Sequence, residues 1–230
     1  MKKIGLIGGM SPESTGAYYQ YITRRYVERF GDYGYPEIII YSVTFQQFRE
    51  WQENGNWEMA AWKMAEAADA LKRAGADFGA IATNTMHYVF EQTQALTSLP
   101  LISIVDATAE AIKEASLTKA GLLGTRFTMR QNFFRDKLQQ QGITTLIPED
   151  EAVQEYIHNT IFGKLCRGIF DREDRDNFLR IIDSLKQRGA QGIICGCTEI
   201  PLLLGKGDGN TKLFDTTYIH AEKLLNEALK

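Results

Sequence analysis

Short apolar runs alternate with longer amphipathic segments along most of the chain. Apolar runs that end at glycine or polar residues are typical of buried strands, and we expect strands at residues 4–7, 37–43, 78–82, 101–105, 120–123, 192–195 and 212–214. Apolar positions that recur every three or four residues predict helices at 13–30, 57–74, 129–141, 150–163, 175–188 and 216–229. Asp106 and Thr108 are favoured capping residues and are expected to begin a further helix. Strands that alternate with helices predict an α/β fold with mostly parallel sheets.

The chain contains an internal repeat. Three landmarks recur in the same order and at a nearly constant separation: residues 4–8 with 120–124, 75–77 with 189–191, and 104–108 with 213–217. Each match alone is weak, because glycine after an apolar strand is common in α/β folds, but together they indicate two related halves. We therefore expect two pseudo-symmetric, Rossmann-like parallel-sheet domains with the active site between them. The first would contain residues 1–105 plus 208–230, and the second residues 106–207.

The repeat also points to the candidate chemistry. Extended without a gap, the second match places Thr83 opposite Cys197. Each of the two follows a predicted strand, and open α/β sheets bind their ligands beyond the carboxyl ends of their strands. Polar residues come next in both halves, at 84–85 and at 198–199. We therefore expect both segments to border one cleft.

The composition is that of a globular protein. Apolar residues make up 44% of the 230 positions and charged residues 24%, which is too apolar and too weakly charged for intrinsic disorder. The net charge of −3 argues against nucleic acid as a partner, because duplex-binding proteins carry a strong basic footprint. The first apolar run is too short for a signal peptide and no run is long enough to span a membrane. We expect a cytoplasmic protein that does not bind membranes.

The three cysteines are too few for a disulfide framework and favour a reducing compartment. Cys195 is expected to be a core residue, because its counterpart in the repeat is Ile81, and Cys166 is expected to pack on a helix. Cys197 stands at a strand end before polar residues and is the candidate reactive thiol. No metal site is expected, because the cysteines and histidines lack zinc-ligand spacing.

Three segments resemble the aspartate/glutamate racemase family: Gly8-Gly9-Met10-Ser11, Thr83-Asn84-Thr85-Met86-His87 and Gly196-Cys197-Thr198-Glu199. The resemblance extends along essentially the whole chain. It implies two similar α/β domains with the site at their interface, and an amino-acid racemase, an isomerase, that uses neither pyridoxal phosphate nor another cofactor. It also implies a homodimer. The usual mechanism of the family uses two cysteines on opposite faces of the substrate, one to remove the Cα proton and the other to deliver a proton.

The chain departs from this pattern at Thr83, which occupies the position of the first cysteine. A threonine hydroxyl does not titrate in the physiological range, so Thr83 is a poor base, although it can donate a proton or relay one through water. The resemblance implies that Cys197 removes the α-proton of an L-amino acid. It also implies that racemases with this Thr/Cys pair prefer L-substrates, including L-glutamate. We therefore expect slow, L-biased racemisation.

Further residues are expected to bind the substrate. Oriented donors near the α-carboxylate would stabilise the carbanion-like transition state, and Asn84, Thr85 and Thr198 can supply them. Glu199 is expected either to orient the substrate ammonium or to adjust the pKa of Cys197. His87 is expected to be a structural histidine at a helix start. The resemblance adds Met10 as a substrate contact, Gln52 for side-chain recognition and Arg167 as a partner for a distal carboxylate.

Two alternatives to the racemase remain open. One is a lyase or isomerase of the same fold with a single cysteine, similar to an arylmalonate decarboxylase, because one thiol is enough to protonate a carbanion that forms by decarboxylation. The other is a non-catalytic amino-acid binder. The Gly-Gly-Met-Ser and Thr-Asn-Thr-Met-His segments favour the racemase.

Overall fold

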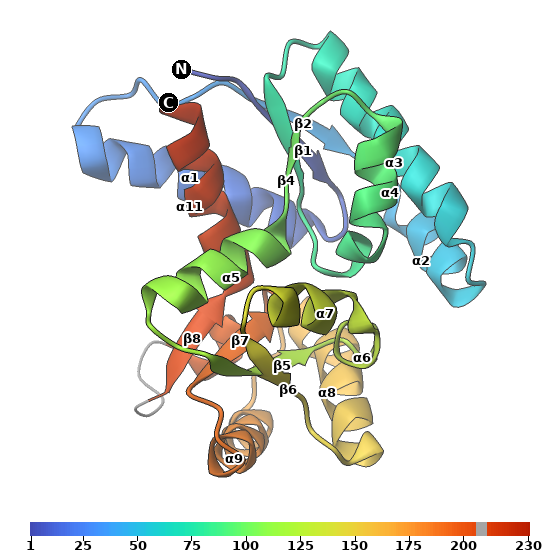
Figure 1. Cartoon of the computed structure of the whole chain (residues 1–230), viewed down its shortest axis with the longest axis vertical. Coiled ribbons are helices and arrows are strands. Elements are labelled where there is room, and N and C mark those ends of the chain that lie inside the picture. Colours follow the sequence, from blue (N-terminus) through green and yellow to red (C-terminus); the bar gives the residue numbers. More distant parts are fainter. Residues whose placement is uncertain (206–210) are drawn as a thin grey trace. The chain divides into compact units, whose positions relative to one another are not determined.

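The computed structural model describes residues 1–205 and 211–230, which form two compact units (Figure 1). The first unit contains Met1–Ala107 together with Thr217–Lys230, and the second contains Thr108–Thr216. Each unit has its own four-stranded parallel sheet and its own buried core. The predicted α/β class with two similar parallel-sheet domains is confirmed.

The chain passes from the second unit back to the first near its C-terminus. The domain boundary expected at 207/208 lies outside the described residues. The strand that follows it, β8 (Lys212–Asp215), was expected in the first domain but pairs with β7 (Gly192–Gly196) of the second unit. The return to the first unit comes one element later, at the start of α11 (Thr216–Ala228).

The sheet of the first unit has its longest fully buried strand in an inner position. The strand order is β2 (Ile38–Ser42), β1 (Ile4–Gly8), β3 (Phe78–Ile81) and β4 (Leu101–Ile102). All five residues of β1 are buried, because helices cover both faces of the sheet. These helices are α1 (Pro12–Phe30), α2 (Phe45–Glu53), α3 (Trp57–Arg73), α4 (Phe90–Leu96) and α11.

Two buried clusters hold these helices to the sheet. On one face, Ile4 and Leu6 of β1 pack with Tyr18 and Ile22 of α1 and with the apolar side of α11. On the other face, Ile7 packs with the alanine-rich side of α3. Neighbouring residues of β1 therefore enter opposite cores, as the alternation of side chains along a strand requires.

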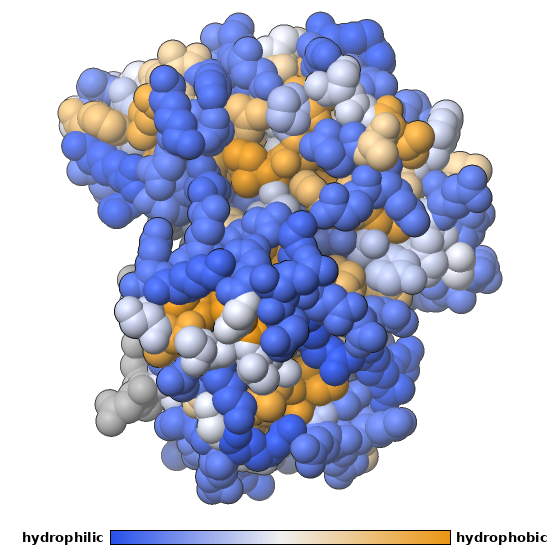
Figure 2. All heavy atoms as spheres, in the orientation of Figure 1, coloured by the Kyte–Doolittle hydropathy of each residue, from blue (hydrophilic) through white to orange (hydrophobic). Residues whose placement is uncertain are grey.

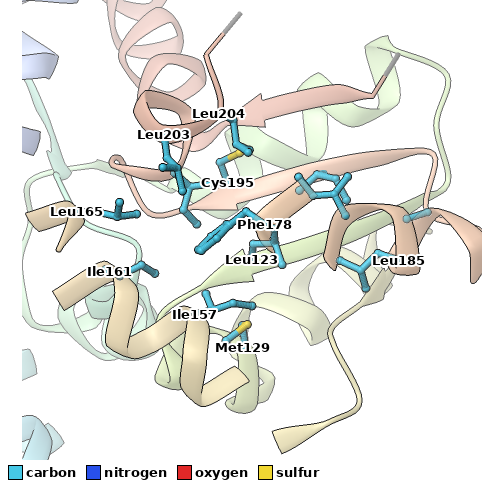
Figure 3. Close-up of a cluster of buried hydrophobic side chains, with 14 residues drawn as sticks. Leu123, Met129, Ile157, Ile161, Leu165, Phe178, Leu185, Cys195, Leu203 and Leu204 are labelled. Atoms are coloured by element: carbon cyan, nitrogen blue, oxygen red, sulfur yellow. The ribbon is translucent and has the colours of Figure 1, made fainter. Parts of the chain in front are cut away.

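The second unit repeats the same topology. The strand order is β6 (Thr144–Leu146), β5 (Lys119–Gly124), β7 and β8. In Figure 3, Phe178 lies at the centre of the core, where Ile157 and Ile161 point toward it. The helices are α5 (Ile104–Glu114), which begins in the first unit, and α6 (Arg126–Arg130), α7 (Asn132–Gln140), α8 (Glu151–Gly163), α9 (Arg172–Gln187) and α10 (Ile200–Leu204).

The internal repeat extends to single hydrogen bonds. Before β3, the Asp77 carboxylate accepts the backbone N–H of Lys3 at 2.6 Å. At the equivalent place before β7, the Gln191 side chain accepts the backbone N–H of Lys119 at 3.0 Å. Both side chains accept a backbone N–H at the start of an inner strand. Equivalent positions of the repeat therefore make equivalent hydrogen bonds in the two halves.

The start of α5 differs from the sequence prediction. A strand at 101–105 and a helix capped by Asp106 and Thr108 were expected, but β4 ends at Ile102 and α5 begins at Ile104. The side chain of Ser103 accepts the backbone N–H of Asp106 at 3.2 Å and so caps the helix. The apolar residues at 104 and 105 are buried helix residues, which a short apolar run does not distinguish from a strand.

The surface facing the viewer in Figure 2 is mostly hydrophilic, with smaller hydrophobic areas between the charged side chains. Among the described residues, no helix is long and apolar enough to cross a membrane.

Candidate active site

The first set of candidate residues surrounds the carboxyl end of β1. Gly9 has a φ of +93°, and a Cβ there would lie 2.4 Å from the carbonyl oxygen of Val43, so only glycine fits this turn. Thr15 closes the turn. Its hydroxyl accepts the Gly9 N–H at 2.9 Å and donates to the Ser11 carbonyl at 2.9 Å. Thr15 was not among the residues predicted from the sequence. The pattern that could have identified it is a threonine in the first turn of a helix that follows Gly-Gly-x-Ser-Pro.

Met10 and Gln52 belong to the same unit as this turn. Met10 is buried and packs in the core cluster that also contains Phe48 of α2. Gln52 lies near the end of α2 and is half-buried. The α2 helix was not predicted from the sequence. It belongs to the first unit and carries Gln52, the candidate side-chain recognition residue.

Thr83, Asn84 and Thr85 follow β3, as the sequence predicts. Thr83 and Thr85 are half-buried, and Asn84 is buried. A 3₁₀ turn at Thr85–Val89 begins directly afterwards. Within this turn the imidazole of His87 lies 2.8 Å from the Thr83 carbonyl oxygen. The candidate hydroxyl therefore stands on a segment whose backbone is held by a buried side chain.

The second set of candidate residues follows β7. Cys197 is half-buried, and its thiol donates to the Glu199 carboxylate at 2.8 Å. The hydroxyl of Thr198 donates to the same carboxylate oxygen at 2.7 Å. Glu199 is buried at the N-cap position of α10, directly before Ile200, where a negative charge is favoured by the helix dipole. The structure thus joins three of the predicted residues through one carboxylate.

The pKa of the Cys197 thiol is raised well above its usual value. Burial is the largest cause, followed by the negative charge of Glu199 and the hydrogen bond to it; the nearby Cys166 adds to the effect. The resting thiol is therefore protonated at neutral pH. The thiol proton points to the Glu199 carboxylate, which can accept it. A thiolate at Cys197 would therefore form beside this carboxyl group.

The other two cysteines differ from each other. Cys195 is fully buried in the core of the second unit, as predicted, and burial raises the pKa of its thiol. Cys166 was expected to pack but is exposed, because it lies in a 3₁₀ turn, Leu165–Arg167, in which Leu165 is the residue that enters the core. Arg167, the predicted carboxylate partner, is exposed in the same turn.

This turn is tied to α9 by an ion-pair cluster that the sequence analysis missed. Lys164 donates to Asp171 at 2.9 Å and to Asp174 at 2.7 Å. The hydroxyl of Tyr156 donates to the other oxygen of Asp174 at 2.6 Å. Within residues 1–205 and 211–230, no group of three or more histidine, cysteine, aspartate or glutamate residues is arranged to hold a metal ion.

The predicted site residues thus form two sets, one in each unit. Met10, Gln52, Thr83, Asn84 and Thr85 lie in the first unit. Arg167, Cys197, Thr198 and Glu199 lie in the second. In each unit the candidate proton-transfer residue follows the third strand along the chain. Thr83 follows β3 and Cys197 follows β7, and both strands are inner strands of their sheets.

Comparison with known proteins gives a consistent result. The family model described as Asp/Glu/Hydantoin racemase matches residues 7–224. The crystal structure of a candidate Asp/Glu racemase from Yersinia pestis is 44% identical, with a TM-score of 0.94 over 100% of both chains. An aspartate racemase homologue from Pyrococcus horikoshii is 39% identical, with a TM-score of 0.88 over 100% of both chains. The broad specificity amino-acid racemase RacX of Bacillus subtilis is 24% identical over 98% of each chain. The chain belongs to the Asp/Glu/Hydantoin racemase family and is, as the sequence predicted, an isomerase.

Proposed function

We propose that this chain is a cofactor-independent amino-acid racemase that prefers L-substrates such as L-glutamate, with Cys197 as the base and Thr83 acting on the opposite face of the substrate. The observation that carries the proposal is the equivalence of Thr83 and Cys197 after β3 and β7, together with the hydrogen bond from the Cys197 thiol to Glu199. The residues 7–224 that match the family model include both positions.

The proposed reaction begins at Cys197. Its thiol proton passes to the Glu199 carboxylate, and the resulting thiolate takes the α-proton of the L-amino acid. The Cα–H bond breaks, an S–H bond forms, and the electron pair remains on Cα. Removal of a proton by a positioned group is general base catalysis, and it requires the thiolate to lie within hydrogen-bond reach of Cα–H.

The reaction ends on the Thr83 side. The Thr83 hydroxyl, or a water that it orients, delivers a proton to the opposite face of Cα. Water then reprotonates the Thr83 oxygen, and the proton held by Glu199 neutralises the hydroxide that remains, which restores the Glu199 carboxylate. The product is the D-enantiomer. In the reverse direction the Thr83 side would have to remove a proton, for which a hydroxyl is a poor base at neutral pH. The two half-reactions therefore use groups of unequal strength. Because the equilibrium constant between enantiomers is one, kcat/KM for racemisation is the same in both directions, and the inequality appears instead as faster exchange of the Cα proton with solvent in the L-enantiomer. This faster exchange is the proposed L-preference.

The remaining residues are proposed to bind the substrate. Asn84, Thr85 and Thr198 would donate hydrogen bonds to the α-carboxylate, where negative charge accumulates in the transition state. Met10 would contact the substrate backbone. Gln52 would recognise the side chain as a neutral donor and acceptor, and Arg167 would pair with a distal carboxylate. A neutral recognition residue accommodates uncharged as well as acidic side chains, which agrees with the broad specificity in the name of RacX.

The lyase alternative rests on one observation, the threonine in place of a second thiol. A panel of L- and D-amino acids incubated in D2O, with an arylmalonate in parallel, separates the possible functions. Deuterium at Cα of an amino acid supports the racemase. Decarboxylation of the malonate without amino-acid exchange would replace it with the lyase, and ligand-dependent thermal stabilisation without either reaction would replace it with the binder.

We also propose that the protein is a homodimer in the cytoplasm. All three cysteines are free, which agrees with a reducing compartment. Sedimentation equilibrium would give twice the chain mass of 26.0 kDa if the dimer forms, and the chain mass itself if it does not.

A further inference from the structure

His87 makes three hydrogen bonds to backbone groups, two of them in the Thr83 segment and one at the start of α5. Its ring Nδ1 lies 2.8 Å from the Thr83 carbonyl oxygen, and its backbone N–H donates to the Asn84 carbonyl at 3.1 Å. Its ring Nε2 accepts the backbone N–H of Ile104 at 3.0 Å. One residue therefore pairs with two carbonyls that follow β3 and with the backbone N–H of the first residue of α5.

These contacts define the tautomer of His87. The Ile104 N–H can only donate, so Nε2 must be the unprotonated nitrogen of the ring. Nδ1 then carries the hydrogen and donates it to the Thr83 carbonyl. The imidazole acts as a neutral bridge with one donor and one acceptor. A charged ring would break the bond from Ile104, and the other tautomer would break both ring bonds.

The ring has little freedom to leave this position. His87 is 5% exposed, and its ring stacks on Phe90 with 5.1 Å between centroids and 6° between planes. On another side it meets the edge of His220 at 6.0 Å. His220 is held in turn by the hydroxyl of Tyr18 at 2.8 Å and by the carbonyl of Ile102 at 2.9 Å.

In the described part of the second unit, the position equivalent to His87 offers no such bridge. In the ungapped repeat alignment Thr83 matches Cys197, and His87 matches Pro201, whose side chain can neither donate nor accept a hydrogen bond. The Cys197 carbonyl instead accepts the backbone N–H of Ile200 at 3.3 Å. The bridge is therefore specific to the half of the molecule that carries the threonine.

We propose that His87 is a positioning residue for the Thr83 face of the racemase: its neutral imidazole fixes the Thr83–Asn84 peptide plane and so sets the place of the Thr83 hydroxyl and the Asn84 N–H. This inference rests on the proposed function. A hydroxyl is a weak proton donor and depends on good geometry, and a displacement of about 1 Å can lower a catalytic rate about 100-fold. His87 itself does not touch the substrate.

Two substitutions separate the two ring contacts. In His87→Asn the amide nitrogen takes the place of Nδ1 and can still donate to the Thr83 carbonyl, but the bond from Ile104 is lost. In His87→Gln the amide oxygen takes the place of Nε2 and can still accept from Ile104, but the Thr83 contact is lost. Tyr18→Phe is the matched control, because it removes a buried hydrogen bond from the same cluster without touching the Thr83 segment.

The experiment starts from the L-enantiomer in D2O and follows two signals by NMR and chiral chromatography. Loss of the α-proton from the retained L-enantiomer reports the Cys197 step, and appearance of the D-enantiomer reports proton delivery from the Thr83 side. We expect His87→Gln to lower D-enantiomer formation about tenfold or more, equivalent to about 1.4 kcal/mol, while exchange with retention stays within about twofold of the wild type. His87→Asn should restore most of the lost D-enantiomer formation.

Each other outcome is decisive. The positioning role would be overturned, with the racemase left intact, if His87→Gln lowered both signals equally or lowered neither. It would also be overturned if Tyr18→Phe lowered D-enantiomer formation relative to exchange with retention by the same factor. Absence of both signals in the wild-type protein, with every amino acid tested, would overturn the proposed function and this role with it.

Discussion

At the scale of the residue, the chemistry of the second unit depends on one carboxylate. Glu199 accepts both the Cys197 thiol and the Thr198 hydroxyl on the same oxygen. Its charge and its hydrogen bond help to keep the thiol protonated by raising its pKa. The same group is the available acceptor when the thiol loses its proton. Glu199 therefore disfavours the thiolate in the resting state, and in the proposed reaction it would accept the thiol proton.

Replacing Glu199 with glutamine should lower the pKa of Cys197, because it removes the nearby negative charge while burial of the thiol remains. The thiolate absorbance near 240 nm should therefore appear at lower pH in Glu199→Gln than in the wild type. The difference between Glu199→Gln and Glu199→Gln/Cys197→Ala isolates the Cys197 signal. Racemisation should nevertheless fall about 10-fold or more, because the proton acceptor is lost. An unchanged thiolate titration in Glu199→Gln would show that Glu199 does not control the pKa of Cys197.

The sequence points to candidate site residues but not to the groups that they contact. Cys197 and Thr83 are found through the repeat, because local patterns and strand ends are visible in the sequence. The contact between His87 and Ile104 is not, because it joins a turn after β3 to the first residue of α5. His87 was correctly expected to be structural, but which backbone groups it holds is decided by tertiary packing.

At the scale of the element, the turn that carries Arg167 is positioned by α9. Lys164, just before the turn, pairs with Asp174 in the first turn of that helix. The Asp174 side chain is 3% exposed and also accepts the Tyr156 hydroxyl. A buried carboxylate with satisfied partners fixes the relation between the end of α8 and the start of α9.

Asp174→Asn should lower the free energy of unfolding by about 2 kcal/mol, because a buried charged acceptor is replaced by a neutral amide. Urea denaturation measures the change. The matched control is Glu151→Gln, which breaks a surface pair with Arg130 at 3.4 Å in which the Glu151 side chain is 82% exposed. The control should leave the urea midpoint unchanged, because exposed pairs are screened by solvent. Equal effects of the two substitutions would show that α9 does not depend on Asp174.

The same scale shows where sequence patterns stop being informative. Long amphipathic helices such as α1 and α3 and complete apolar strands such as β1 follow from the sequence. The short elements α2, α4 and β6 do not, because a few residues carry too little periodicity. At the start of α5 the apolar residues continue without interruption from strand to helix, and only the Ser103 cap in the structure marks the change.

At the scale of the whole molecule, two buried neutral histidines couple stability to pH. Burial lowers the pKa of His87 to about 4 and, together with the neighbouring His87 ring, that of His220 to about 3. In the unfolded chain both would titrate near their usual value of about 6.5. Below that pH the unfolded state binds more protons than the folded state, so stability is complete above about pH 6.5 and falls as the pH decreases toward 4.

The free energy of unfolding should therefore decrease by up to about 1.4 kcal/mol per pH unit for each histidine between about pH 6 and pH 4. Urea denaturation over this range gives the slope. His220→Asn should reduce the slope by about half of this contribution, even though it lowers stability at neutral pH. A slope that is unchanged in this variant would show that His220 is accessible to protons in the folded protein.

The central claim is that Cys197 and Thr83 form an unequal pair of proton-transfer groups on the two faces of an amino acid. The most direct test is the initial rate of deuterium incorporation at Cα from D2O, measured separately for L- and D-glutamate with the wild-type protein and with Cys197→Ala. We expect faster deuterium exchange at Cα of the L-enantiomer than of the D-enantiomer, and loss of the L-exchange in Cys197→Ala. Faster exchange into the D-enantiomer, or full activity in Cys197→Ala, would contradict it.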